Sequence, residues 1–571
     1  MCAIFGVVGE VERDLAVKAL QTLAHRGSDE EKIYEKEGLF LGHRRLYILN
    51  PKAHQPLERE GKVALFNGEI YNYKELKALS EIEAIIQSYP NFSELDGMFA
   101  FGLYDGKKLY LGRDIFGKKP LFYYKDESRF VFSSEIKGIV TYLGQKRFEH
   151  KALSGYLSFG ALPDRHTFYQ DISKLLPGEL LIYDSKTKKI THSELGSFLQ
   201  TKSKDLEEGI HRGIQKRLQG DFPIASLLSG GVDSSLVAAL AKKEQGSLAT
   251  FSIGYEDERY SELPYARLVA QHIGSDHTEV LFGKEEFFAT FEELLGHFDE
   301  PIGDSASVPL AYLFGQIKKQ GFRVVLSGEG GDEIFLGYRQ YFEFLDMLQA
   351  KNLKYKNWLK NYFRTHFSPN KEWEWYKRIF SDELLFRSTC EVFTDLQKNL
   401  FLRQNVRDGE SVEFLEPFLS RWERSGLNED AIFMSYIDMM VRLAALYLAK
   451  LDTTSMLHTI EARTPLLDRE IVAAAFGNPQ RTKEPKFLLK QIAAKYIPDE
   501  IIGRKKKGFS YPHMQWLMRS DYIQKMERIN DEAGFFKPDQ LSFLIQNAKR
   551  NRFSRHFWLA LTFLLWYERN L

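Results

Sequence analysis

The sequence contains only two cysteines, Cys2 and Cys390, among 571 residues. Two thiols are too few for a disulfide framework, so we expect a protein of a reducing, cytoplasmic compartment. An excess of one charge is also absent, because Lys+Arg and Asp+Glu both number 78 and the formal net charge is zero. No global field therefore attracts a polyanion. We expect neither a nucleic acid nor a membrane as a partner.

Long hydrophobic runs are equally scarce. The most apolar stretch covers residues 557–566, about half of the roughly 20 residues that a membrane span needs. We interpret it as a buried C-terminal helix. The N-terminus turns acidic at Glu10 and lacks the basic start and sustained apolar core of a signal peptide. What the chain does have is length, because 571 residues exceed one core and predict two or three compact units.

Up to about residue 190 the pattern is one of short strands separated by turns. The clearest strands are 39–42, 63–66, 98–104 and 109–112, and a hairpin tip follows at 183–190. The segment from Gly196 to Lys204 is polar and weakly patterned. It is the candidate linker between two domains.

From Leu206 onward the rhythm changes to strand, loop and helix. Apolar runs of strand length occur at 223–228, 250–254 and 323–326, and a helix at 236–243 follows the first of them. This alternation predicts a parallel sheet covered on both faces. Beyond about Arg339 the pattern is helical and rich in aromatics and lysines. Solvated helices with aromatic cores are the favoured interpretation there, ahead of a basic-aromatic surface for RNA.

The first candidate reactive group is Cys2. Removal of Met1 would leave its thiol beside a free α-amino group, whose ordinary pKa near 8 suits a base for the adjacent nucleophile. Taken alone, Cys2 could equally be a small buried residue. The motif at 67–72, which follows the strand at 63–66, favours the reactive interpretation. A thiolate attacking an amide needs donors for the oxyanion, and the Asn67 side chain and the Gly68 backbone N–H can supply them.

Arginines in the same region could bind a substrate carboxylate, because a guanidinium matches a carboxylate in a bidentate manner. His25 to Asp29 and His43 to Leu46 contain such residues. For Arg26 and Arg44 we favour ordinary surface charge.

The second candidate site begins with Ser229, Gly230, Gly231, Asp233 and Ser234, between an apolar strand and a helix. Paired glycines let backbone N–H groups face an anion, and the helix N-terminus adds its dipole. The loop lacks the Lys-Ser/Thr ending of a Walker motif. The alternative is a simple helix cap, for which one serine or aspartate would suffice.

A matching acidic loop at 327–333 also follows an apolar strand. In a doubly wound sheet, both loops would emerge at the carboxyl ends of strands, where ligands bind. Asp233 and Asp332 could then share a Mg²⁺ ion, because hard oxygen ligands suit it. The acidic loop alone could be a solvated turn, so the pairing carries this prediction.

Together these motifs resemble the glutamine-hydrolysing asparagine synthetases over nearly the whole chain. The matching segments are 1–6, 67–72, 97–101, 112–114 and 119–121 in the first part, and 229–235, 327–333, 461–468 and 505–516 in the second. The resemblance implies an α/β multi-domain protein. Residues 1–195 would form a four-layer αββα N-terminal-nucleophile glutaminase domain. Residues 205–571 would form a doubly wound parallel-sheet ATP-pyrophosphatase domain with a helical C-terminal part.

The resemblance also implies a reaction and its ligands. Glutamine would be hydrolysed, and ATP with Mg²⁺ would adenylate aspartate, giving AMP and pyrophosphate. Ammonia would pass through an internal tunnel and displace AMP. Glutamine, ATP and aspartate are thus the expected small-molecule partners, and a homodimer is the assembly that we would test.

Residue roles follow from motif position in this family. Cys2, Asn67, Gly68, Glu329 and Lys486 would be catalytic, and Arg45, Asn67, Gly68 and Glu69 would hold glutamine. The nucleotide would contact Leu228, Ser229, Gly230, Gly231, Ser234, Ile253, Ser327 and Gly328. Asp233 and Asp332 would bind the metal.

Three departures from the family pattern affect these expectations. Ser28 stands where the family has proline, and the segment from Lys74 to Glu94 is short. Within that segment Glu81 replaces the aspartate that meets the α-amino group of glutamine, although it could instead open a helix through Ile85. The stretch 299–305 resembles only some branches. Besides aspartate, the acceptor could therefore be another carboxylate, such as a sugar acid or a peptide. A third alternative is a non-catalytic relative that binds nucleotide.

Overall fold

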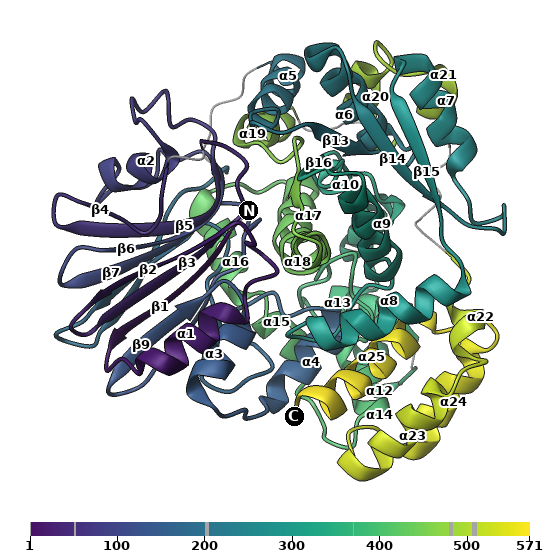
Figure 1. Ribbon diagram of the computed structural model, residues 1–571. Coiled ribbons are helices and arrows are strands. Elements are labelled where there is room, and N and C mark those ends of the chain that lie inside the picture. Colours follow the sequence, from purple (N-terminus) through teal and green to yellow (C-terminus); the bar gives the residue numbers. More distant parts are fainter. Residues whose placement is uncertain (1, 51–52, 200–204, 369, 479–482, 505–510) are drawn as a thin grey trace.

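The computed structural model describes residues 2–50, 53–199, 205–368, 370–478, 483–504 and 511–571. Parts of two expected segments, the linker at 196–204 and the motif at 505–516, lie outside these ranges, as does Met1. The described chain forms an N-terminal β-rich part, a parallel sheet and a large helical part (Figure 1).

The N-terminal part contains two antiparallel six-stranded sheets. The first has the order β10 (Ile172–Lys174), β8 (Phe122–Lys125), β9 (Arg129–Ser133), β1 (Ala3–Gly9), β3 (Leu39–Arg45) and β2 (Glu30–Lys36). The second has the order β12 (Ile190–Glu194), β11 (Glu179–Asp184), β7 (Lys108–Arg113), β6 (Gly97–Tyr104), β5 (Lys62–Ile70) and β4 (Leu57–Arg59). The strands expected from the sequence lie in β3, β5, β6 and β7, and the hairpin joins β11 to β12.

The two sheets pack face to face over a shared apolar core. Ile4, Leu41 and Phe132 of the first sheet meet Leu65 and Leu111 of the second, and all five are fully buried. This follows from strand alternation, which turns every second side chain inward. Helices α1 (Arg13–Gln21) and α3 (Ile136–Leu143) cover the first sheet, and α2 (Glu81–Gln87) packs on β5 of the second. The four-layer prediction is confirmed.

The second sheet system has five parallel strands. Its order is β15 (Asp276–Leu281), β14 (Ala249–Gly254), β13 (Ile224–Leu227), β16 (Val324–Leu326) and β17 (Glu461–Arg463). Chain order reverses between β13 and β16, which makes their carboxyl ends the switch point where a doubly wound sheet binds ligands. Helix α6 (Val232–Gln245) belongs to the core on one face, and α9 (Ser307–Lys319) packs on the other. The doubly wound prediction is confirmed.

The described chain contains many further helices, joined by turns and loops. They are α4 (His150–Phe159), α5 (Leu206–Arg217), α7 (Leu263–Ile273), α8 (Lys284–His297), α10 (Gly331–Ile334), α11 (Arg339–Leu348), the 3₁₀ turn η1 (Gln349–Asn352), α12 (Lys356–Thr365), α13 (Lys371–Phe380), α14 (Asp395–Phe401), α15 (Glu410–Glu413), α16 (Glu416–Ser425), α17 (Asp430–Asp438), the π-helix η2 (Met439–Leu448), α18 (Ala449–Leu457), α19 (Arg469–Gly477), α20 (Phe487–Ala493), α21 (Asp499–Gly503), α22 (His513–Leu517), α23 (Tyr522–Ala533), α24 (Pro538–Ala548) and α25 (Ser554–Asn570).

Two of these helical segments are apolar enough to be compared with a membrane span. Helix α25 is buried along 557–566, as expected. Sequence patterns did not single out the continuous run Asp430–Leu457, which is long and apolar enough to cross a membrane. In the folded chain 72% of its most apolar window is buried, and α17 and α18 lie in the middle of the molecule (Figure 1). It is a core helix here.

Candidate active sites

Cys2 directly precedes β1 and contacts β5 of the other sheet. Its backbone N–H donates to Asn67 Oδ1 at 3.1 Å, and Arg26 Nε donates to its carbonyl oxygen at 3.3 Å. Cys2 is buried, and burial raises the pKa of its thiol. The nitrogen that Asn67 holds becomes the α-amino group once Met1 is removed. The fold therefore places the nucleophile and its neighbouring base against one asparagine.

Asn67 also supplies the polar group that an oxyanion requires. Its side chain is fully buried, and its Nδ2 has no hydrogen-bond partner among the described residues. A buried donor without a partner is costly unless a ligand completes it. Next to it, Gly68 adopts φ +126°, and a Cβ there would meet Met98 O at 1.9 Å. Only glycine fits this position.

The arginines behave differently from one another. Arg45 is buried, stacks over Tyr47 at 4.5 Å and donates from Nη2 to Asn50 O at 2.8 Å. Arg44 pairs with Glu31 near the surface, as expected. The surface interpretation of Arg26 is wrong, because its side chain is fully buried. Its Nη1 lies 2.8 Å from both the Glu135 and the Asp452 carboxylates, which offset the cost of burying its charge.

Glu81 is the first residue of α2, but it is not the cap of that helix. The cap is Ser80, whose hydroxyl accepts from the Glu83 N–H at 3.4 Å. The Glu81 carboxylate turns to β5 and accepts from the Ile70 N–H at 2.8 Å. It also faces Glu69, and burial, reinforced by nearby carboxylates, raises the pKa of both groups, that of Glu81 to about 7. A buried pair of neighbouring carboxyls favours a cation beside it.

Arg463 of β17 reaches this carboxyl pair from the parallel sheet. Its Nη2 lies 3.6 Å from Glu69 Oε1, and its Nε donates to Glu461 Oε1 at 2.6 Å. Its backbone oxygen accepts the Ser327 N–H at 2.8 Å. One residue thus contacts both candidate sites. In the sequence, Glu461 and Arg463 were recognised only as part of a family motif, and no role was predicted for them.

The loop after β13 closes on itself through its serines. Ser229 N–H donates to Ser234 Oγ at 3.1 Å, and the two hydroxyls lie 2.8 Å apart. Helix α6 has Gly231 as its N-cap, with no side-chain cap. The helix-cap alternative is therefore wrong. Gly230 adopts φ +71°, and a Cβ there would come within 2.6 Å of the Tyr265 Cβ.

The acidic loop after β16 packs directly on the first loop. A Cβ on Gly328 would lie 2.7 Å from Ser234 N, and one on Gly331 would lie 2.5 Å from Asp233 Oδ1. Gly328 has no room for a side chain because the backbone of the first loop lies against it, and a side chain at Gly331 would have to displace the Asp233 carboxylate. Leu228 is fully buried, and its backbone N–H donates to Phe251 O at 2.8 Å. Its carbonyl oxygen accepts the Ser252 hydroxyl, so its backbone is tied to β14.

Asp233 and Asp332 converge on the ammonium group of Lys486. Its Nζ lies 2.8 Å from Asp332 Oδ1 and is also paired with an oxygen of Asp233. Although burial opposes it, these two carboxylates raise the pKa of Lys486. Lys486 adopts φ 59° just before α20. A cation already lies between the two predicted metal ligands, so this pair of hard oxygen donors fits a Mg²⁺ ion.

The remaining predicted residues flank this centre. Ile253 is the last residue but one of β14, the strand that pairs with β13, and Glu329 lies on the second loop. Lys450 of α18 binds Asp304 at 2.8 Å, and Asp304 and Glu329 together raise its pKa despite burial. The 299–305 stretch thus contributes Asp304 to the surroundings of Glu329. Ser28, the other departure, is exposed and lies outside both sites.

Comparison with known proteins places these two sites in a family. A model of the asparagine synthase family matches residues 205–568, and a glutamine amidotransferase domain model matches residues 1–195. The chain belongs to the asparagine synthase family. Asparagine synthetase [glutamine-hydrolyzing] 1 of Bacillus subtilis is 28% identical over all of this chain and 97% of its own length.

Other members of the asparagine synthase family match parts of the chain. A putative asparagine synthetase [glutamine-hydrolyzing] 2 of Methanocaldococcus jannaschii is 33% identical over 59% of this chain and 76% of its own length. Among solved structures, the glutamine phosphoribosylpyrophosphate amidotransferase from B. subtilis is 15% identical over 58% of this chain and 77% of its own, with a TM-score of 0.25. The family matches establish an enzyme of the glutamine-hydrolysing asparagine synthetase class.

Proposed function

We propose that the chain hydrolyses glutamine at Cys2 and uses the ammonia to amidate aspartate, which ATP has first activated. One observation carries the proposal: Cys2 and the donor-rich Asn67 form one centre, while Asp233, Asp332 and Lys486 form another. Between them lies a buried interface whose polar groups come from both domains. We propose residues 1–195 and 205–571 as the domains, in a cytoplasmic protein, and a homodimer as the assembly.

The glutaminase step follows from the contacts of Cys2. With Met1 removed, the α-amino group accepts the thiol proton, and the sulfur attacks the side-chain amide carbon of glutamine. Asn67 Nδ2 and the Gly68 N–H donate to the oxyanion, and the protonated amine then delivers its proton to the departing ammonia. Water releases glutamate from the thioester by the reverse use of the same groups. Arg45 would hold the substrate α-carboxylate.

The synthetase step uses the two loops at the switch point. Backbone N–H groups of 229–231 and the start of α6 would hold the phosphates, with Ser327 and Gly328 beside the nucleotide. Asp233 and Asp332 would bind Mg²⁺, which neutralises pyrophosphate charge when present. Lys486 would then turn to the phosphate, and Glu329 would lie near the aspartyl group that becomes adenylated. Ammonia displaces AMP from that acyl-adenylate.

The test of this function is ATP–pyrophosphate exchange across a panel of carboxylates. We expect exchange with aspartate and none with a sugar acid or a C-terminal peptide carboxylate. Exchange with one of the other acceptors alone would replace aspartate by that acceptor. Absence of exchange with every carboxylate would contradict the synthetase function and favour a nucleotide-binding relative.

Glu81→Gln should raise the KM for glutamine about tenfold to a hundredfold. A charge-assisted hydrogen bond to the substrate ammonium is worth about 1.5–3 kcal/mol, and each 1.4 kcal/mol is about tenfold. Ammonia-dependent synthesis should not change, because it bypasses this pocket. Glu83→Gln is the matched control, since Glu83 lies in the same helix but pairs with Arg59. An unchanged KM in Glu81→Gln would leave Glu81 with only a structural contact to β5. Glu81→Asp should also be poorly tolerated, because the shortened 74–94 segment fits the longer arm.

The pH dependence of glutamine binding provides a separate prediction. Burial and the neighbouring carboxylates raise the pKa of Glu81 to about 7 and also raise that of Glu69. Below pH 7 the pair holds a proton and binds an ammonium weakly, whereas above it the pair is more negative. The KM for glutamine should therefore fall as pH rises from 6 to 8, and Glu81→Gln should flatten this fall. Initial rates of glutamate formation, measured at fixed ionic strength, check it; a KM that rises over this range would contradict the shared proton.

A further inference from the structure

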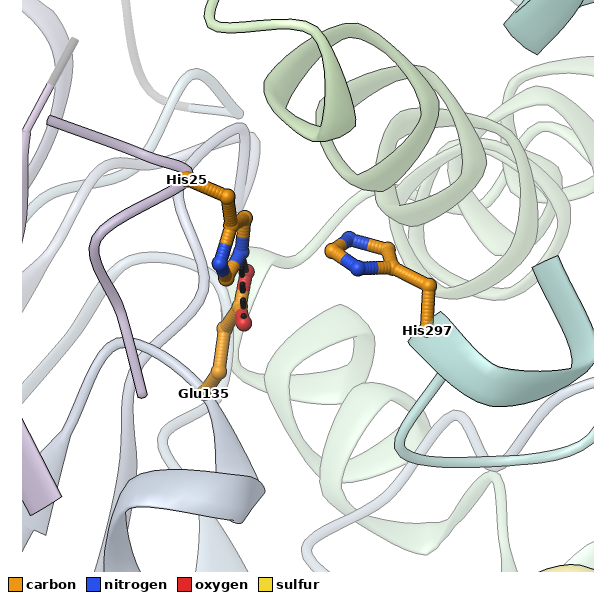
Figure 2. A group of neighbouring side chains, drawn as sticks. All are labelled: His25, Glu135 and His297. Carbon is orange, nitrogen blue, oxygen red and sulfur yellow. Dashed lines mark hydrogen bonds and ion pairs between the residues drawn. The ribbon is translucent and has the colours of Figure 1, made fainter. Parts of the chain in front are cut away.

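Three side chains outside both active sites meet in the interface between the two domains. His25 follows α1, Glu135 precedes α3, and His297 is the last residue of α8. Figure 2 shows the two imidazoles and the carboxylate turned toward one another. His25 Nε2 lies 3.1 Å from the Glu135 carboxylate, and the two imidazole rings meet edge to face with centroids 4.6 Å apart. One nitrogen or oxygen atom from each side chain lies within 4.8 Å of the others.

The imidazole of His297 lacks a polar partner in this cluster. Its Nε2 is buried and has no hydrogen-bond partner among the described residues. Burial, followed by the nearby Lys137, lowers the pKa of His297 to about 3, so the ring is neutral at physiological pH. A neutral imidazole with a buried lone pair pays a desolvation cost that a bound ion would remove.

Two cations already contact Glu135, and any metal ion must coexist with them. Arg26 Nη1 lies 2.8 Å from Oε1, and Lys137 Nζ lies 2.8 Å from Oε2. Each has another partner, because Arg26 also binds Asp452, while Lys137 donates to the His297 carbonyl at 2.9 Å and lies 3.6 Å from Asp299. Lys137 can therefore leave Oε2 without losing all of its compensation. The competition predicts an affinity below that of a closed structural zinc site.

The donor set identifies the class of ion. Two imidazoles and one carboxylate suit Zn²⁺ and neighbouring transition metals, whereas Mg²⁺ and Ca²⁺ require more oxygen ligands. We propose that His25, Glu135 and His297 form a Zn²⁺-type binding site that joins the glutaminase domain to the synthetase domain. None of the three takes part in a chemical step of the proposed reaction.

Metal binding at this site would also affect the contacts that hold Cys2. His25 is adjacent in sequence to Arg26, whose Nε donates to the Cys2 carbonyl at 3.3 Å, and Glu135 contacts Arg26 directly. A metal ion on His25 and Glu135 therefore constrains the arginine that holds the nucleophile's backbone. We expect Zn²⁺ to alter the rate of glutamine hydrolysis while it links the domains.

Cobalt titration tests the site with the full-length chain. The protein is freed of metal with a chelator and carries Cys2→Ser, so that the thiol near this region does not contribute. With excess Mg²⁺ present to occupy sites made of oxygen ligands, we expect one Co²⁺ per chain, with visible d–d absorption, no thiolate charge-transfer band, and displacement by Zn²⁺. His297→Gln and His25→Gln, one from each domain, should each weaken Co²⁺ binding at least about tenfold. Even changes to residues that only support metal ligands typically cost about 10–100-fold in affinity. The matched control is His458→Gln, because His458 Nε2 is also buried without a partner among the described residues but belongs to no such cluster.

Thermal unfolding gives a second readout that does not depend on activity. A ligand that binds only the folded chain raises its melting temperature. Zn²⁺ should raise the Tm of the Cys2→Ser and His458→Gln chains, and should not raise that of His297→Gln or His25→Gln. Equal Co²⁺ affinity in all variants, a thiolate charge-transfer band, or no binding by the Cys2→Ser chain would each overturn the proposal.

Discussion

Cys2→Ala should abolish glutamine hydrolysis and leave synthesis from free ammonia intact. The alanine retains the buried backbone contact to Asn67 but has no sulfur to attack the amide. Loss of the nucleophile in covalent hydrolases costs up to roughly 10⁶-fold in turnover. We therefore expect glutamate release to fall by at least about 10⁴-fold. Ammonia added directly reaches the synthetase site without the first reaction, so ATP-dependent product formation with ammonium should match the parent chain.

The matched control for this substitution is Cys390→Ala. Cys390 is the other cysteine and is fully buried, and its thiol contacts the Ser388 hydroxyl. Glutamine hydrolysis at the parental rate in Cys2→Ala would show that another group is the nucleophile. The amine requirement is checked on the same samples, since mass spectrometry of active protein should show that Met1 is absent. A chain that retains Met1 should be inactive with glutamine and active with ammonia.

The strands of the first domain could be predicted because their signal is local. The segments 63–66 and 98–104 are short, continuous apolar runs that are buried along almost their whole length, and turns punctuate the strands. Strand β17 carries no such signal. Glu461 and Arg463, at its ends, are charged yet fully buried. They pair with each other, and Arg463 also contacts Glu69 and the Arg217 carbonyl, which are distant in sequence. Strand propensity cannot anticipate a pairing that tertiary structure alone creates.

The same reason explains the error at Arg26. A lone arginine in a short polar motif is usually a surface residue. Its carboxylate partners are Glu135 and Asp452, which follow 109 and 426 positions later in the chain. Asn67 could be recognised from the sequence because it comes directly after an apolar run and is followed by a glycine. The roles of Glu81 and Lys486 were predicted only from their positions in family motifs. Their contacts depend on tertiary structure and could not be predicted from the sequence.

The interface between the two domains contains buried lysines of the first domain that bind groups of the second. Lys119 Nζ binds Asp452 at 3.2 Å, and Lys118 Nζ donates to the Leu467 carbonyl at 2.7 Å. Burial lowers the pKa of Lys118 to about 7. Buried pairs of this kind contribute little net stability, but removal of one partner is costly. They fix the relative position of the two sites, which a passage for ammonia would require.

Asp233→Asn and Asp332→Asn should each stop synthesis and spare glutamine hydrolysis. Both carboxylates contact the Lys486 ammonium at the carboxyl ends of β13 and β16, where Mg²⁺ and pyrophosphate would bind. Loss of one charge-stabilising group in an active site typically costs about 10²–10³-fold in turnover. We expect that decrease in AMP and pyrophosphate formation, together with a higher Mg²⁺ requirement, whereas glutamate release at Cys2 continues. Asp276→Asn, an exposed residue of the same sheet, is the control and should behave like the parent. Parental synthesis by either variant at limiting Mg²⁺ would contradict a shared metal site, and ADP with orthophosphate as products would contradict adenylation altogether.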